Sequence, residues 1–220
     1  MAEVFDSQSL IAAIQRASHG LLENSEFLTS LDQAMGDGDL GITMGKVGEA
    51  LLAYTQNAQP TDLGKFLMSA GMEANKAAPS TMGTLLATAL MRAGKEITGK
   101  TEFSAIDAAA MLHAAFTGIQ ERGKANLGDK TVLDAIHPAD EALSAGVAAG
   151  LSLKDAGLKA LQAAKDGRDS VTPLQNKVGR ASWLGERTKG LTDPGCNAFV
   201  VVLESIVGKQ HQGDFYEYIK

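Results

Sequence analysis

The chain has 220 residues, of which 45 % are hydrophobic and 21 % charged, and this composition excludes wholesale disorder. A net charge of −6 argues against nonspecific binding to nucleic acids or anionic membranes, and the single cysteine, Cys196, excludes a disulfide scaffold. No basic segment followed by an apolar run opens the chain, and no apolar run approaches the roughly 20 residues of a membrane span, so we expect a cytoplasmic protein.

Apolar residues at helical spacing predict a succession of helices. The expected helices begin after a cap at Ser7 or Ser9, after the glycine-rich segment 36–41 and at Thr61–Asp62, and then cover 83–95, 104–121, 131–148, 152–169, 172–189 and 196–208. The run Phe199–Leu203 is rich in β-branched residues, but it has no partner run, and we interpret it as a buried helix turn. We therefore predict an all-α fold in which residues 1–220 form one domain of about eight antiparallel helices.

The segment 32–43 carries the strongest chemical signal. Asp32, Asp37 and Asp39 alternate with glycines, and converging carboxylates repel one another unless a cation lies among them. Oxygen ligands favour magnesium or calcium, and the EF-hand pattern fails because the twelfth residue counted from Asp37 is a glycine. A helix starting at about Gly41 would offer free N–H groups to a phosphate. The segment predicts a site for magnesium and phosphate, and the alternative is a solvated turn that caps the helix.

A second segment, Gly94–Thr101, matches the phosphate-binding loop pattern G-x4-G-K-[ST]. Such a loop requires a buried strand before it and a helix after it. The preceding residues 85–92 have the pattern of a helix instead. We interpret the segment as a helix end, a turn and the next helix start, and keep a P-loop enzyme as an alternative.

Several later blocks pair glycine with charged residues. They are Gly128-Asp129-Lys130-Thr131, Gly179-Arg180-Ala181-Ser182, Gly185-Glu186-Arg187 and Asp193-Pro194-Gly195. Together with the acidic segment and Met82-Gly83-x-Leu85, they occur in the order found in the nucleotide-binding L subunit of dihydroxyacetone kinase (DhaL-like). The chain resembles this family over nearly its whole length.

The resemblance implies an up-down barrel of eight antiparallel helices with ADP or ATP bound at one end. Asp32, Asp37 and Asp39 would hold two Mg²⁺ ions that bridge the phosphates, and Arg180 would be catalytic, near the transferring phosphoryl group. The residues implied to contact the nucleotide are Leu40, Gly41, Ile42, Thr43, Thr81, Met82, Gly83, Gly123, Val132, Arg180, Asp193, Pro194 and Gly195.

The resemblance also implies that a separate K-type subunit binds the substrate, dihydroxyacetone or a related small ketose, and that the chain is active only with this partner. The form Gly-Asp-Gly-Asp-x-Gly-x-Thr is closer to ATP-using relatives. A free-standing L chain, however, is commoner where a phosphocarrier subunit recharges bound ADP, so both phosphoryl donors stay open. The alternative function is a nucleotide-dependent regulatory partner without catalysis of its own.

Overall fold

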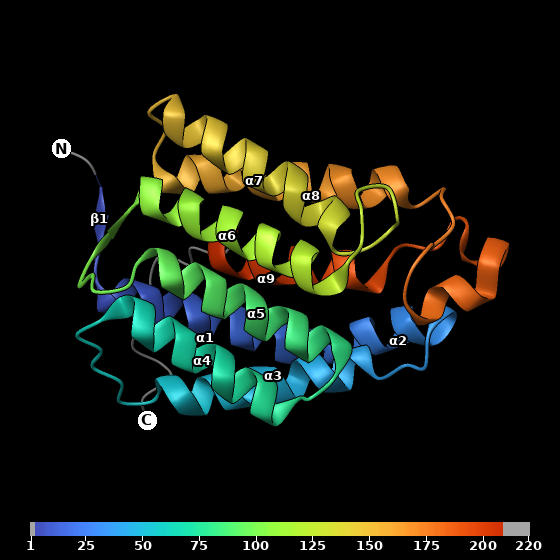
Figure 1. Cartoon of the computed structure of the whole chain (residues 1–220), viewed down its shortest axis with the longest axis horizontal. Coiled ribbons are helices and arrows are strands. Elements are labelled where there is room, and N and C mark those ends of the chain that lie inside the picture. Colours follow the sequence, from blue (N-terminus) through green and yellow to red (C-terminus); the bar gives the residue numbers. More distant parts are fainter. Residues whose placement is uncertain (1–2, 209–220) are drawn as a thin grey trace.

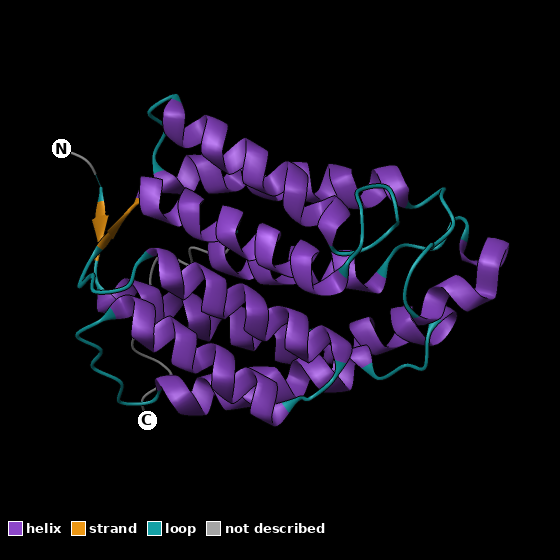
Figure 2. Ribbon diagram, in the orientation of Figure 1, coloured by secondary structure: helices purple, strands orange, loops and turns teal. Residues whose placement is uncertain are grey.

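The computed structural model describes residues 3–208, so residues 1–2 and 209–220 of the predicted domain lie outside the described part. Helices dominate this part (Figures 1 and 2). Its nine α-helices are α1 (Ser7–Glu23), α2 (Ser25–Met35), α3 (Leu40–Thr55), α4 (Leu63–Ala77), α5 (Thr81–Glu96), α6 (Ala105–Gly123), α7 (Leu133–Ala148), α8 (Leu153–Val171) and α9 (Pro194–Val207). A 3₁₀ helix, η1 (Arg180–Thr188), precedes α9, and two short antiparallel strands, β1 (Val4–Phe5) and β2 (Phe103–Ser104), pair with each other. The all-α prediction is confirmed.

Eight of the helices form a closed ring. α1 packs on α3, α3 on α4, each helix from α4 to α8 on the next one, and α9 packs back on α1. Neighbouring helices of the ring run in alternating directions along the long axis of the molecule, while α2 lies at one end (Figure 1). The ring is the barrel of eight antiparallel helices that the resemblance implied.

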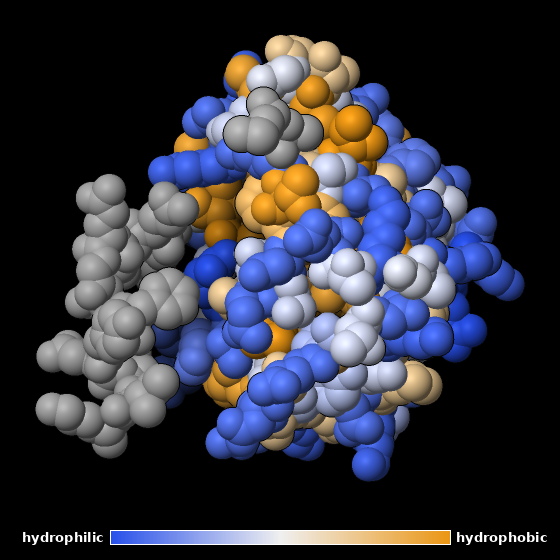
Figure 3. All heavy atoms as spheres, turned by 90° about the vertical axis from the view of Figure 1, so that its left-hand side faces the viewer, coloured by the Kyte–Doolittle hydropathy of each residue, from blue (hydrophilic) through white to orange (hydrophobic). Residues whose placement is uncertain are grey.

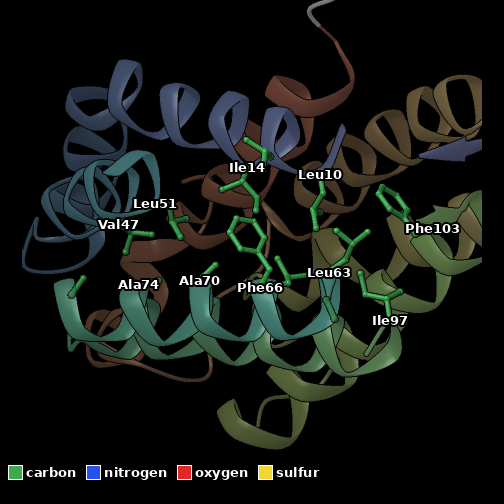
Figure 4. Close-up of a cluster of buried hydrophobic side chains, with 14 residues drawn as sticks. Leu10, Ile14, Val47, Leu51, Leu63, Phe66, Ala70, Ala74, Ile97 and Phe103 are labelled. Atoms are coloured by element: carbon green, nitrogen blue, oxygen red, sulfur yellow. The ribbon is translucent and has the colours of Figure 1, made fainter. Parts of the chain in front are cut away.

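Small residues let the helices approach closely. A Cβ atom on Gly64 would lie 2.4 Å from the carbonyl oxygen of Gly94, and one on Gly94 would lie 2.6 Å from that of Gly64, so α4 and α5 require glycine at both positions. Next to this contact, one cluster of buried side chains joins α1, α3 and α4 through Leu10, Val47 and Phe66 (Figure 4). A core built largely from alanine and aliphatic residues explains why a chain with 5 % aromatic residues can bury enough apolar surface.

The structure contradicts the P-loop alternative. Residues Gly94–Glu96 complete α5, and the turn that follows leads to β2 at the end of the barrel opposite Thr81. The Lys100 ammonium lies 2.5 Å from the Asp107 carboxylate at the start of α6. The strand that a phosphate-binding loop requires is therefore replaced by a helix, as the apolar pattern of 85–92 indicated.

Two local predictions were wrong, one helix was missed and one prediction was confirmed. Asp6, and neither Ser7 nor Ser9, caps α1, because its carboxylate accepts a hydrogen bond from the Ser9 N–H at 2.9 Å. Helix α2 was not predicted, and the helix expected over 172–189 is a loop followed by η1. The run Phe199–Leu203 lies inside α9, as predicted.

The surface around β1 is mixed in character over the described residues. Figure 3 shows the end of the molecule with β1, where hydrophilic residues predominate between small hydrophobic patches. Within residues 3–208, every helix is too short or too polar to traverse a bilayer.

Candidate functional site

Four helices of the barrel begin at the same end of the molecule. In Figure 1, α3, α5, α7 and α9 all start on the right-hand side. Their first residues Leu40, Thr81, Leu133 and Pro194 line one cleft of about 1710 Å³. Helix N-termini present free N–H groups and the positive end of the helix dipole, and both favour anions. The cleft therefore suits a ligand that carries several negative charges.

The three predicted carboxylates converge at the edge of this cleft. Asp32 lies in the last turn of α2, and its carboxylate accepts a hydrogen bond from the Leu40 N–H at 3.2 Å. Asp37 and Asp39 lie on the short connection to α3, and each of the three residues offers an oxygen within 4.8 Å of the other two. Gly36 permits this tight connection, because a Cβ atom there would lie 2.3 Å from Asp32 Oδ1. A set of three carboxylate oxygens, two of them on exposed residues, fits a hard cation such as Mg²⁺.

Arg180 reaches the same carboxylates from a distant part of the chain. Its guanidinium forms an ion pair with Asp37 and lies 3.5 Å from Asp39, although 141 residues separate Arg180 from Asp39. All three side chains are about half exposed, so the pairs are screened by solvent and open to exchange. The structure therefore places the predicted catalytic residue beside the predicted metal ligands.

The start of α5 forms another part of the cleft wall. Ser80 caps the helix, since its hydroxyl accepts a hydrogen bond from the Gly83 N–H at 3.1 Å. Thr81 and Met82 line the cleft. Gly83 does not, because it packs against the carbonyl of Ala78, from which a Cβ atom would be only 1.9 Å away.

Of the four residues predicted to contact the nucleotide at the start of α3, one lines the cleft and three do not. Leu40 lines the cleft, whereas Gly41 faces α2, where a Cβ atom would lie 1.9 Å from the carbonyl oxygen of Ser25. Thr43 is buried and its N–H donates to the Asp39 carbonyl at 2.9 Å, and the side chain of Ile42 is 55 % exposed. The nucleotide contacts predicted for Gly41, Ile42 and Thr43 stay predictions.

The opposite wall contains the rest of the predicted residues. Its cleft-lining members among them are Gly123, Val132, Arg180, Asp193, Pro194 and Gly195. Asp193 caps α9, because its Oδ1 accepts a hydrogen bond from the Cys196 N–H at 2.8 Å. Burial raises the pKa of Asp193 to about 6, against the opposing effect of hydrogen bonds from Cys196 and Asn176.

The structure places two residues at this wall to which sequence reasoning assigned no role, Lys130 and Asn176, which line the cleft but are almost fully buried. The sequence left Trp183, the single tryptophan, open between lining the site and packing, and it lines the cleft while 87 % exposed. Lys130 belongs to one of the glycine-containing blocks noted in the sequence, whereas Asn176 belongs to no motif. The partners of Asn176, Lys130 and Asp193, lie 46 and 17 residues away in the chain, so only the folded structure reveals these contacts.

Comparisons with known proteins agree on one family. The family model of the DAK2 domain matches residues 34–208. The ADP-binding subunit DhaL of PEP-dependent dihydroxyacetone kinase 1 from Listeria innocua is 34 % identical over 190 residues, which cover 84 % of this chain and 87 % of that subunit. The corresponding ADP-binding subunit from Escherichia coli is 30 % identical over 182 residues, covering 83 % and 87 % of the two chains.

A solved structure supports the fold. The dihydroxyacetone kinase of C. freundii, determined in complex with AMP-PNP and Mg²⁺, aligns with a TM-score of 0.70 at 21 % identity. The alignment covers 94 % of this chain and 35 % of that kinase, so the chain spans about a third of its length.

Proposed function

The chain belongs to the DAK2 domain family, and from this membership we propose that it is the nucleotide-binding subunit of a kinase for dihydroxyacetone or a related small ketose. One observation carries the proposal. Three converging carboxylates and the first residues of four helices line the same cleft, which combines ligands for cations with the positive ends of four helix dipoles, which favour phosphates.

Asp32, Asp37 and Asp39 are the residues that hold Mg²⁺, as two ions. Bound Mg²⁺ neutralises charge on phosphate oxygens, and neutralisation together with positioning is most of what phosphoryl transfer requires. Arg180 binds a phosphate oxygen of a nucleotide at these carboxylates, because its guanidinium already lies beside two of them. This placement supports a catalytic role for Arg180, near the transferring phosphoryl group.

The nucleotide extends from the acidic residues across the cleft. Leu40, Thr81 and Met82 line the cleft at the starts of α3 and α5, where the positive ends of the helix dipoles favour phosphates. Gly41, Ile42, Thr43 and Gly83 belong to the first turns of the same two helices and complete the proposed set of nucleotide contacts. Residues of the opposite wall frame the remainder of the nucleotide: Gly123, Val132, Asp193, Pro194 and Gly195.

A K-type subunit supplies the ketose. We take ADP as the resident nucleotide and a phosphocarrier subunit as the donor that recharges it, because the relatives from Listeria innocua and Escherichia coli are named ADP-binding subunits of PEP-dependent kinases. ATP as the donor is the competing outcome. An assay of phosphoryl transfer with the K-type subunit and either ATP or the phosphocarrier decides between the two donors. Activity of this chain alone on free ketose would contradict the proposal that a K-type subunit binds the substrate.

Calorimetric titration of ADP with and without Mg²⁺ tests the binding site itself. We expect Mg²⁺ to tighten ADP binding at least about tenfold, and Asp37→Asn to abolish this gain because it removes a metal ligand. The matched control is Asp166→Asn, an exposed aspartate on α8 that is absent from the cleft wall. Binding of ADP that is independent of Mg²⁺ and insensitive to Asp37→Asn would overturn the proposal.

A further inference from the structure

The chain leaves the barrel after α8 and returns before α9, and the loop 172–188 in between carries Arg180. The two ends of this loop meet at one side chain. The Lys130 ammonium donates hydrogen bonds to the carbonyl oxygens of Thr172 (3.1 Å), Leu174 (2.9 Å) and Thr188 (2.6 Å). An ammonium group has three N–H donors, so all of its donors are engaged by the base of the loop.

Lys130 is itself firmly held. Its side chain is 1 % exposed, and its backbone has a φ of 62°, a left-handed conformation that is uncommon outside glycine. The Asp134 carboxylate secures the turn around it, accepting hydrogen bonds from the N–H groups of Gly128 at 2.6 Å and Thr131 at 2.8 Å. The block Gly128-Asp129-Lys130-Thr131 is thus a fixed platform at the start of α7.

A second set of contacts joins the same platform to the loop. Asn176 donates from its side-chain amide to the Lys130 carbonyl at 2.9 Å and to the Asp193 carboxylate at 3.2 Å. Its backbone N–H donates to the Thr188 hydroxyl at 3.1 Å. Burial lowers the pKa of Lys130, and the nearby Asp193 carboxylate opposes that shift, so a negative group compensates the buried ammonium.

Arg180 lies on the outer part of this loop. There η1 packs against α2, and Arg180 forms its ion pairs with Asp37 and Asp39. The base of the loop is therefore fixed to α7, and its outer part reaches the acidic residues at the far side of the cleft.

We infer that Lys130 is a positioning residue, whose ammonium holds both ends of the loop 172–188 and thereby places Arg180 beside the three carboxylates. The contribution to nucleotide binding rests on the proposed function, whereas the fastening of the loop does not. Displacing a binding group by about 1 Å can cost on the order of a hundredfold in rate, so a loop free at its base would leave Arg180 present but poorly placed.

Limited trypsin digestion of the folded chain without nucleotide tests the fastening. Lys130→Met keeps most of the apolar stem but removes the three donors, and we expect cleavage after Arg180 and Arg187 to become about tenfold faster or more. The control Lys159→Met removes an exposed lysine on α8, outside the loop and the platform, and should leave these two cleavage rates unchanged. Equal cleavage rates in the wild type and Lys130→Met would overturn the inference.

A double-mutant cycle on ADP binding in the presence of Mg²⁺ tests the positioning. Lys130→Met and Arg180→Ala should each weaken binding, and the double variant should be no weaker than Arg180→Ala alone, because the lysine acts through the arginine. Additive losses would contradict this role. If the wild type binds no ADP, the proposed function fails, while the digestion still decides whether Lys130 holds the loop.

Hydrogen exchange of the wild type covers the case in which Lys130→Met does not fold. The amides of Asn176 and Gly190 donate to the Thr188 hydroxyl and the Thr172 carbonyl at the base of the loop. We expect both amides to exchange at least about a hundredfold more slowly than in an unfolded chain. Exchange at the unfolded rate would show that the base of the loop is open, and would refute the inference.

Discussion

At the scale of single residues, the site contains charged groups in two contrasting environments. The carboxylates of Asp37 and Asp39 are about half exposed and paired with Arg180, so they can exchange that partner for a cation. Asp193 is buried, and its carboxylate serves as the cap of α9 next to the Lys130 ammonium. The exposed carboxylates of Asp37 and Asp39 suit binding of a ligand from solution. The buried carboxylate of Asp193 instead holds the wall of the cleft in place.

The buried carboxylate of Asp193 gives folding stability a pH dependence with a defined sign. Its pKa is raised from 3.8 to about 6, so between these values the folded chain holds a proton that the unfolded chain has lost. Lowering the pH from 7.5 to 5 should therefore add about 1 kcal/mol to the free energy of unfolding through this group. Urea denaturation at the two pH values measures the change, and Asp193→Asn should remove this component.

The matched control for this measurement is Asp166→Asn, since Asp166 is exposed. It should retain the pH-dependent gain of the wild type. An identical pH dependence in the wild type and Asp193→Asn would contradict the assignment of the raised pKa.

The sequence was informative for residues whose chemistry is local. Asp32, Asp37 and Asp39 lie within eight positions, and spacing alone predicted that they converge, as the structure confirms. The role of Lys130 could not be predicted, because the carbonyls that it binds lie 42, 44 and 58 residues further along the chain. Backbone carbonyls belong to every residue type, so no sequence pattern marks them as partners.

At the scale of elements, the junction of α2 and α3 sets the geometry of the acidic residues. The sequence did not predict α2 for two reasons. Only one residue, Asn24, separates it from α1, and only two of its side chains, Leu28 and Met35, are buried, so its apolar pattern is weak. The helix expected over 172–189 was wrong for a complementary reason. Pro173 follows the end of α8, and Gly179 and Gly185 adopt positive φ angles of 70° and 57°, which interrupt an otherwise helical pattern.

The contact between α2 and α3 requires glycine at one position but not one turn later. A Cβ atom on Gly41 would lie 1.9 Å from the Ser25 carbonyl oxygen, whereas one on Gly45 would lie 3.6 Å from its nearest neighbour, the Ser25 hydroxyl. Gly41→Ala should therefore lower the free energy of unfolding by about 1–3 kcal/mol through overpacking. Gly45→Ala should be neutral or stabilising by up to about 1 kcal/mol, because alanine favours helix.

Chemical denaturation of the two variants beside the wild type measures these changes. The pair differs only in the position of one added methyl group on the same helix, so the comparison isolates the close approach of α3 to α2. Equal free energies of unfolding for Gly41→Ala and Gly45→Ala would contradict the prediction, because α2 would then move away from α3 without loss of stability.

At the scale of the whole molecule, alternation of helix direction explains why the site lies at one end. Because neighbours in the ring run in opposite directions, every second helix begins at the same end, and the starts of α3, α5, α7 and α9 meet at the cleft. Apolar spacing and turn residues predicted the eight helices of the ring in their order, but they missed α2 and predicted a helix over 172–189 that is a loop followed by η1. Closure of the ring depends on packing between α1 and α9, which come from opposite ends of the chain. The sequence pattern did not predict this closure, which was expected only from the resemblance to a family, and membership of that family is confirmed.

A ligand that bridges several helix starts should stabilise the whole barrel. ADP with Mg²⁺ at about 100 times the dissociation constant adds roughly 2.7 kcal/mol to the free energy of unfolding, which corresponds to a rise in Tm of about 5–10 °C for a chain of this size. Scanning calorimetry should show this rise in the wild type and in Asp166→Asn. A chelator, or Asp37→Asn, should remove most of it, because the carboxylates then hold no cation against the phosphates. A rise of equal size with Mg²⁺ alone would contradict the argument, since it would place the stabilisation in the acidic residues and not in the contact across the cleft.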